Sequence, residues 1–235
     1  MIPYRDTIPS RYTPWMTWAL IVLNLAVFAY TESLSEQDLY FFLNLHGLVP
    51  ARYAYPEWAA KVGFPVDDYT PFVSSIFIHG SALHLILNLW LLWIFGDNVE
   101  DRMGSIRFLA FYLLCGLIAG AVHVYSNSHS NIPTIGASGA IAGVMGAYYF
   151  LFPYSRVVIW MFFLPWFVEV PAVAFLGIWV IIQLYKVTTG LSSDEPFADV
   201  AWFGHLGGFI AGMLLHRLFL LAERKEDTHY KRHST

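Results

Sequence analysis

Six long apolar stretches dominate this 235-residue chain and limit the folds that it can adopt. A helix needs roughly 20 apolar residues to cross the hydrocarbon core of a bilayer, so each stretch is a candidate membrane span. The stretches cover residues 15–30, 72–95, 106–125, 137–152, 168–187 and 202–221. We therefore predict an all-α polytopic membrane protein with a bundle of six transmembrane helices.

The amino-acid composition favours the same class of protein. Hydrophobic residues make up 57% of the chain, charged residues only 13%, and the mean hydropathy is +0.53. A soluble domain has about 25% charged residues. The single cysteine, Cys115, excludes an internal disulfide and a metal site built from cysteines.

The basic residues predict how the spans are oriented. Ten arginines and lysines fall on one side of the six spans, namely Arg5, Arg11, Arg102, Arg107, Arg156, Arg217, Arg224, Lys225, Lys231 and Arg232. Only Arg52, Lys61 and Lys186 fall on the other side. Because loops rich in Lys and Arg stay in the cytoplasm, we expect both termini to be cytoplasmic. We expect a multi-pass protein of a prokaryotic plasma (inner) membrane.

This orientation divides the chain into three parts. Residues 1–14 form a cytoplasmic N-terminal segment, residues 15–222 a membrane domain, and residues 223–235 a cytoplasmic tail. The membrane domain includes one long outer loop, about residues 31–71, whose aromatic residues suit the headgroup level of a bilayer. Pro165 and Pro171 are expected to separate an interfacial turn from the fifth span, because proline interrupts a helix.

The polar residues inside the spans are the main evidence for function. Ser138 begins the fourth span and His205 lies near the start of the sixth. Glycines recur in both spans, at Gly139, Gly143 and Gly146 and at Gly204, Gly208 and Gly212. Such small residues let two helices approach closely, so we expect Ser138 and His205 to come within hydrogen-bond range.

A serine beside a histidine is the arrangement that nucleophilic hydrolysis of a peptide bond requires. His205 could take the hydroxyl proton of Ser138, and hydrogen-bond donors must then stabilise the oxyanion. His84 and Asn88 are four residues apart in the second span and share one helix face, so both could supply donors, together with the backbone N–H of Ser138. His79 is expected in the same span, nearer its outer end. No acidic residue is obviously placed to orient His205, which favours a Ser-His dyad.

The chain resembles the rhomboid intramembrane serine proteases. The resemblance rests on the sequences GASG at 136–139, GHLGGFIAG at 204–212 and EDRMG at 100–104, and on His79, His84 and Asn88. It implies that Ser138 is the nucleophile and His205 the base, with His84 and Asn88 in the oxyanion hole and no cofactor or metal. It also implies substrates that are single-span or polytopic membrane proteins, cleaved in or near a transmembrane segment.

Other positions carry weaker expectations. Gly136, Gly139, Gly208 and His79 are expected to support the site, and Glu100 and Gly104 to tie the inner loop to the helix ends. His123 and His216 are expected to be interfacial or solvated. Two positions depart from the resemblance. Ala142 stands where many members have an aromatic residue that stacks on the histidine, and no Trp-Arg pair occurs between residues 31 and 71. Other packing must therefore hold His205.

The fifth span is the best candidate for a mobile wall through which a substrate reaches Ser138. Phe175 and Trp179 lie four residues apart on one face and are expected to pack against the second span, which carries Trp90 and Trp93. The segment 188–193 is expected to be a flexible loop after this span. The resemblance likewise implies a lateral gate between these two helices.

Three other functions remain to be weighed. A non-catalytic rhomboid-like protein that binds membrane clients would be expected to lack the serine or the histidine. A small proton-coupled transporter could use Glu169 and buried histidines, but it would predict internal repeats, and the two halves of the chain are not similar. A zinc protease would need a His-Glu-x-x-His run, which is missing. We expect the lipid bilayer as a partner, and neither nucleic acid nor metal.

Overall fold

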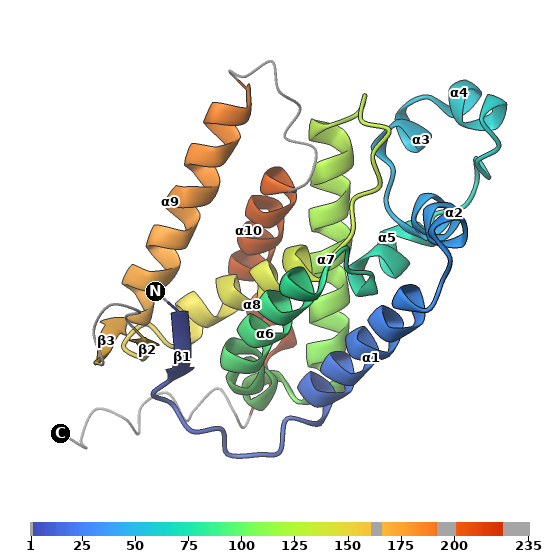
Figure 1. Cartoon of the computed structure of the whole chain (residues 1–235). Coiled ribbons are helices and arrows are strands. Elements are labelled where there is room, and N and C mark those ends of the chain that lie inside the picture. The colour runs from blue at the N-terminus through green and yellow to red at the C-terminus, as the bar shows by residue number, and fades with distance from the viewer. Residues whose placement is uncertain (1, 161–165, 192–200, 223–235) are drawn as a thin grey trace.

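The computed structural model describes residues 2–160, 166–191 and 201–222. Six helices in this part of the chain form the bundle shown in Figure 1. They are α1 (Trp15–Glu32), α6 (Ala82–Met103), α7 (Ser105–Ser126), α8 (Ser138–Leu151), α9 (Ala172–Leu191) and α10 (Trp202–Phe219). The protein is thus a helical membrane bundle, and each of the six apolar stretches contributes one of these helices.

Length and composition distinguish the helices of the bundle. α1, α6, α7 and the segment Ala172–Thr189 of α9 are long and apolar enough to cross a membrane, and α8 is apolar but shorter. α10 has 18 residues but is not among the four, since His205, His216 and Arg217 lower its mean hydropathy.

Helix α8 lies in the middle of the bundle, between α6, α7, α9 and α10 (Figure 1). Every residue from 140 to 148 is buried. At 1.5 Å per residue its 14 residues extend roughly 21 Å, which is less than the ~30 Å thickness of a hydrocarbon core. One end of α8 must therefore stop inside the bundle, as expected for the fourth span.

Glycines bring α8 and α10 into backbone contact. A Cβ atom at Gly208 would collide with the carbonyl of Gly139, and one at Gly212 would collide with the carbonyl of Gly143. No larger residue fits at these two positions without separating the helices, as expected from the glycine spacing. This contact fixes the depth of the N-terminal end of α8 relative to α10.

The last turn of α6 anchors the start of α1. The Glu100 carboxylate accepts hydrogen bonds from the backbone N–H groups of Met16 and Thr17 at 2.9 and 2.8 Å, and from the Thr17 hydroxyl at 2.8 Å. Helix N-termini favour such an anion. Gly104, with a φ of +76°, ends α6, and its N–H donates to the Glu100 carbonyl. The expectation that Glu100 and Gly104 tie this turn to helix ends is confirmed.

The outer loop contains short helices that lie beside the bundle. They are α2 (Glu36–His46), α3 (Pro50–Ala54), α4 (Pro56–Lys61) and α5 (Pro71–Ser74), and a 3-10 turn, η1 (Ser75–Phe77), follows. Arg52 is fully buried and holds the loop together. Its guanidinium donates to the carbonyl of Pro65 at 2.8 and 3.0 Å and to the carboxylate of Asp68 at 2.9 Å.

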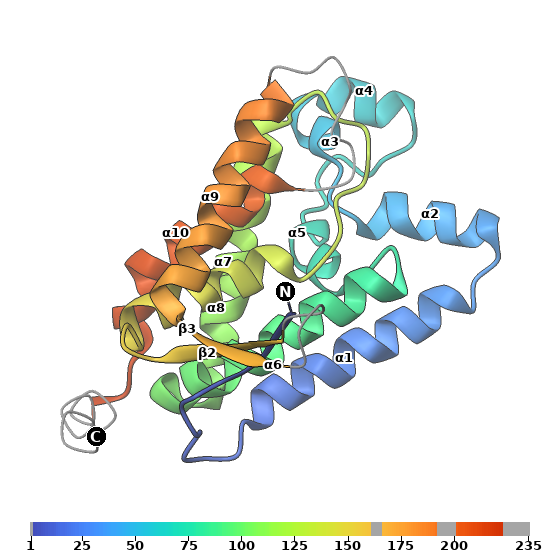
Figure 2. The ribbon, with the colours of Figure 1, turned by 60° about the vertical axis from the view of Figure 1, so that its left-hand side comes forward.

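The prediction of an all-α fold missed a small antiparallel sheet, β1 (Ile2–Asp6), β2 (Arg156–Trp160) and β3 (Phe167–Pro171), in that spatial order. Val157 and Ile159 in β2 are buried against the bundle, and the chain after β3 enters α9. Glu169 on β3 pairs with Arg156 on β2 at 3.5 Å, and both side chains are about half exposed. In both views the sheet lies at the end of the bundle opposite α3 and α4 (Figures 1 and 2).

Two predicted boundaries need correction, and the predicted turn before α9 takes the form of a hairpin. The second span was expected at 72–95, but α6 begins at Ala82, where the Ser81 hydroxyl caps its first turn by accepting from the His84 N–H. The interfacial turn before α9 is the β-hairpin, which ends at Pro171 as the proline predicted, whereas Pro165 lies outside the described residues. Residues 188–191 continue α9 and are not loop, and residues 192–193 and the tail 223–235 lie outside the described part.

Candidate active site

Ser138 is the first residue of α8, so its side chain lies at a helix N-terminus within the bundle. The chain enters α8 through Gly136, whose N–H donates to the Ser75 carbonyl at 2.9 Å. The first intrahelical bond of α8 runs from the Ile141 N–H to the Ala137 carbonyl. The N–H groups of the first turn, including that of Ser138, therefore have no acceptor within the helix and favour a negative charge nearby.

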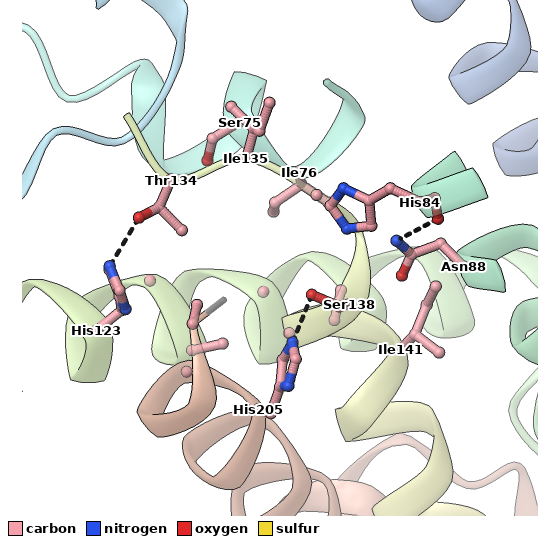
Figure 3. Close-up of a pocket in the computed structure, with 18 of the residues that line it drawn as sticks. Ser75, Ile76, His84, Asn88, His123, Thr134, Ile135, Ser138, Ile141 and His205 are labelled. Atoms are coloured by element: carbon pink, nitrogen blue, oxygen red, sulfur yellow. Dashed lines mark hydrogen bonds between the residues drawn. The ribbon is translucent and has the colours of Figure 1, made fainter. Parts of the chain in front are cut away.

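Ser138 lines a cavity of about 700 Å³ that α6, α7, α8, α9 and α10 surround. His205 from α10 and His84 and Asn88 from α6 also line it. Figure 3 shows His205 on one side of the Ser138 hydroxyl and His84 and Asn88 on the other. The structure thus brings together the four residues that the sequence singled out, although they come from three separate helices.

The Ser138 hydroxyl and the His205 ring are in direct contact. Ser138 Oγ lies 2.8 Å from His205 Nε2, within the range of a hydrogen bond (Figure 3). A deprotonated Nε2 in this position can accept the hydroxyl proton, which would make Oγ a nucleophile. The expected contact between the two helix ends is present because the glycine contacts of α8 and α10 set their depth.

Asn88 and His84 share one face of α6, as their spacing predicted. The Asn88 amide Nδ2 donates to the His84 carbonyl at 3.0 Å, and the Asn88 side chain is buried. This bond uses one of the two amide protons, so the other is available to a ligand in the cavity. The pair is therefore arranged to supply donors on the side of Ser138 opposite His205.

Gly136 controls the approach of the His84 ring to Ser138. Its φ of +127° lies in the region that favours glycine. A Cβ at this position would lie 2.8 Å from His84 Cε1 and 2.9 Å from His84 Nε2. Any side chain here would strain the backbone and displace the ring of His84, so the expected supporting role of Gly136 has a steric basis.

Comparison with known proteins gives the family. Residues 67–222 match the sequence model of the Rhomboid domain, which covers α6 to α10 and every cavity-lining residue named above. The chain belongs to the rhomboid family. The resemblance that the sequence motifs suggested is thereby confirmed.

Several curated rhomboid proteins are similar to this chain. Rhomboid protein 1, mitochondrial, of Saccharomyces cerevisiae is 23% identical over 215 residues, which cover 90% of this chain and 54% of the yeast protein. Presenilin-associated rhomboid-like protein, mitochondrial, of Homo sapiens is 32% identical over 146 residues, which cover 61% of this chain and 36% of the human protein. RHOMBOID-like protein 5 of Arabidopsis thaliana is 30% identical over 149 residues, 63% of this chain and 43% of the plant protein.

The chain spans about half or less of the length of these relatives. Two of the three are named mitochondrial, so the relatives give no support to the predicted prokaryotic plasma membrane. The apolar helices and the family place this rhomboid in a membrane.

Tryptophans contact His205 where many rhomboids would use an aromatic residue at Ala142. The His205 ring lies 6.0 Å from the Trp179 ring and 5.9 Å from the Trp202 ring, measured between centroids. Ala142 itself is fully buried inside α8. The aromatic support comes from α9 and α10 in this rhomboid, which accounts for the first departure from the family pattern. Arg52 anchors the outer loop in the absence of a Trp-Arg pair.

The sequence interpretation missed Gln183, which contacts the other nitrogen of His205. Gln183 Oε1 lies 2.8 Å from His205 Nδ1, and the glutamine side chain is only 3% exposed. Gln183 is an uncharged amide, whereas Asp and Glu are the residue types expected to orient a catalytic histidine. The available signal was an amide in the middle of an otherwise apolar span, four residues after Trp179.

Three histidines lie in unexpected places. His79 is buried before α6 begins, outside any helix, and its ring packs edge-on against His84 at 5.1 Å. It does not line the cavity, so any support it gives to the site acts through His84. His123 and His216 were expected at an interface or in solvent, but both are buried. His123 Nε2 lies 2.7 Å from the Thr134 hydroxyl and fixes the chain before Ser138 (Figure 3).

The expected packing of α9 against α6 is only partly present. Phe175 stacks on Phe95 of α6 at a centroid distance of 6.2 Å. Trp179 instead packs on Phe209 of α10 at 5.8 Å, in addition to His205. The prediction that Trp179 packs against α6 is wrong, because Trp179 lies one turn beyond Phe175, where α9 is packed on α10.

Proposed function

We propose that this rhomboid is an intramembrane serine endopeptidase that cleaves membrane-anchored proteins in or near a transmembrane segment. Ser138 is the nucleophile and His205 the general base of a dyad. The observation that carries the proposal is the 2.8 Å distance between Ser138 Oγ and His205 Nε2 in a cavity within a membrane bundle. A hydroxyl and an imidazole are costly inside a bilayer, which favours a functional reason for their presence.

The reaction follows from these positions. His205 Nε2 takes the proton as Ser138 Oγ attacks the carbonyl carbon of the scissile peptide bond. The developing oxyanion receives hydrogen bonds from Asn88, His84 and the Ser138 N–H. His205 then returns the proton to the leaving amine, and an acyl-enzyme remains. A water molecule, deprotonated by His205, attacks the ester carbonyl; the acyl–Oγ bond breaks, His205 returns the proton to Ser138 Oγ, and the second product leaves as a carboxylic acid.

The remaining parts of the proposal concern substrates and orientation. Substrates are single-span or polytopic membrane proteins, because the cavity lies within the bundle. Both termini face the cytoplasm, which the distribution of Arg and Lys supports. The N-terminal strand β1 and the outer-loop helices α3 and α4 lie at opposite ends of the bundle, as this orientation requires (Figure 2).

Cleavage of a single-span reporter in liposomes tests the proposal. We expect Ser138→Ala and His205→Ala each to abolish cleavage while the thermal unfolding midpoint stays close to that of the wild type. Ser126→Ala, an exposed serine at the end of α7, is the matched control and should cleave at the wild-type rate. Full turnover by Ser138→Ala would contradict the assignment. A wild-type protein that binds the reporter without cleaving it would favour the client-binding alternative.

The structure gives the transporter alternative no support. Glu169, the acid that such a relay would use, lies on the exposed hairpin in its ion pair with Arg156. Glu169 does not line the cavity, whose histidines, His84, His123 and His205, come from α6, α7 and α10.

A further inference from the structure

The second nitrogen of the His205 ring has a partner that the dyad does not include. Gln183, on α9, directs its amide oxygen to His205 Nδ1 at 2.8 Å. Its side chain is 3% exposed, so bulk water does not compete for this contact. His205 is thus held between α8 at Nε2 and α9 at Nδ1.

The orientation of the Gln183 amide follows from its second contact. Gln183 Nε2 donates to the Trp179 carbonyl, one helical turn earlier, at 3.3 Å. If the amide were turned over, its oxygen would face the carbonyl oxygen of Trp179, and two acceptors would oppose each other. The amide oxygen therefore faces His205.

This orientation fixes the tautomer of the histidine. An amide oxygen can only accept, so Nδ1 of His205 must carry the proton. A neutral imidazole protonated at Nδ1 has its lone pair at Nε2, which faces Ser138 Oγ. The contact thus selects the form of His205 that can act as a base toward Ser138.

We propose that Gln183 is a positioning residue that holds His205 in its basic tautomer and in line with Ser138. The proposal rests on the proposed function of the dyad. In serine proteases with a third member, a carboxylate has this role. Here an uncharged amide provides it, which avoids placing an additional charge inside the bilayer.

The position of Gln183 on α9 has a mechanical consequence. α9 contributes Gln183 and Trp179 to the surroundings of His205, whereas α10 carries the ring itself. An outward shift of α9 would remove the acceptor from Nδ1 and leave the tautomer free. The contact that selects the basic tautomer is thus present while this part of α9 is packed on α10.

Two substitutions separate hydrogen bonding from packing. Gln183→Met keeps the length of the side chain but has no oxygen acceptor, and Gln183→Glu restores one. We expect Gln183→Met to lower kcat for the reporter about 10- to 100-fold with KM changed less than about twofold, because the loss of one buried acceptor acts on the transition state. We expect Gln183→Glu to retain kcat within about threefold of the wild type.

The matched control is Asn24→Leu in α1. Asn24 is also a buried amide that donates to the carbonyl one turn earlier, at Leu20, but it is remote from the cavity. This variant should keep the wild-type kcat. Equal loss of kcat in Gln183→Met and Gln183→Glu, or full kcat in Gln183→Met, would overturn the proposal. Both outcomes are interpreted only when the wild type cleaves the reporter and Ser138→Ala does not. Failure of the Gln183 proposal can therefore be told apart from failure of the proposed dyad.

Discussion

The Asn88 side chain has one amide proton engaged in α6 and a second one left for the cavity. The first donates to the His84 carbonyl, which holds the side chain in place before any substrate arrives. A donor that is already fixed needs little reorganisation when negative charge develops on a carbonyl oxygen. The hydrogen bond from Asn88 should therefore stabilise the transition state more than the bound substrate.

We predict that Asn88→Ala lowers kcat for a single-span reporter by roughly 10²–10³-fold, as the loss of one oxyanion donor does in known serine proteases, with little change in KM. Steady-state cleavage in liposomes measures both constants. Asn24→Ala is the control, since Asn24 makes the same one-turn hydrogen bond in α1, away from the cavity. A rise in KM at constant kcat would show that Asn88 binds substrate instead.

At the residue scale, the sequence predicted the site from polar residues whose burial in lipid costs free energy. Ser138, His205, His84 and Asn88 are polar groups in apolar runs, and the structure places all four around one cavity. Gln183 satisfies the same criterion but was missed, because it is an uncharged amide and not one of the carboxylates expected beside His205. The geometry of a hydrogen bond between α9 and α10 cannot be derived from a pattern within either helix.

At the scale of elements, the glycine spacing predicted the α8–α10 contact correctly. Gly208 and Gly212 each face a carbonyl of α8, and this is a property of helix surfaces that sequence periodicity reports well. The sheet was missed for the opposite reason. A short run such as β2, rich in Val and Ile, has the same apolar character as a helix segment, and pairing with the distant β1 decides its conformation.

The outer loop contains a charge whose ionisation matters for stability. The Thr70 hydroxyl and N–H, with the Arg52 guanidinium, hold the pKa of Asp68 below its usual value. Arg52 is fully buried, so the carboxylate also balances its charge. A carboxyl whose pKa is lowered in the folded state stabilises the fold above the unfolded pKa of about 3.9 and loses this contribution as pH falls through the folded value.

We predict that Asp68→Asn unfolds the outer loop more readily than the wild type at pH 7, and that the difference between the two proteins shrinks below about pH 4. Amide hydrogen exchange across residues 45–70 measures this as a function of pH. Asp67→Asn is the control, because Asp67 is exposed and the Arg52 guanidinium donates to Asp68 and to backbone carbonyls instead. A difference that persists unchanged at pH 3 would show that the amide acts through packing rather than charge.

At the scale of the whole molecule, the cavity must open for a transmembrane substrate to reach Ser138. α9 is the candidate wall, since its outer face is exposed at Ile178 and Ile181 and its contact with α6 runs through Phe175 and Phe95. Trp90 is not part of this contact, because its indole N–H donates to the Pro3 carbonyl of β1. Trp179 packs on α10 beside His205 and would confound a test of opening.

We predict that Phe175→Ala raises the cleavage rate of a full transmembrane substrate severalfold while lowering the unfolding temperature, if opening limits turnover. Ile178→Ala, on the exposed face of α9, should change neither quantity. Cleavage rates and thermal unfolding of the same liposome preparations provide the measurement. A less stable Phe175→Ala with unchanged or slower cleavage would exclude a gate at this residue but would not affect the dyad.

The number and order of the spans, the short central helix and the family could all be derived from the sequence, because hydropathy and motif order are properties of the chain alone. The start of α6 and the hairpin before α9 could not, since a serine cap and strand pairing decide them. The same limit applies to α9, where Phe175, Trp179 and Gln183 recur every four residues along one side. Only packing shows that Phe175 faces α6 and Gln183 faces α10.

The central claim is that Ser138 is a nucleophile activated by His205. A fluorophosphonate probe reacts with an activated serine hydroxyl, so its site of attachment, read by peptide mass spectrometry, tests the claim directly. We predict labelling of the wild type at Ser138, none in Ser138→Ala, and labelling of His205→Ala slowed by at least about 100-fold, since the base supplies the activation. Labelling of Ser138→Ala at the wild-type rate, or a cleaving wild type that is never labelled at Ser138, would contradict the account.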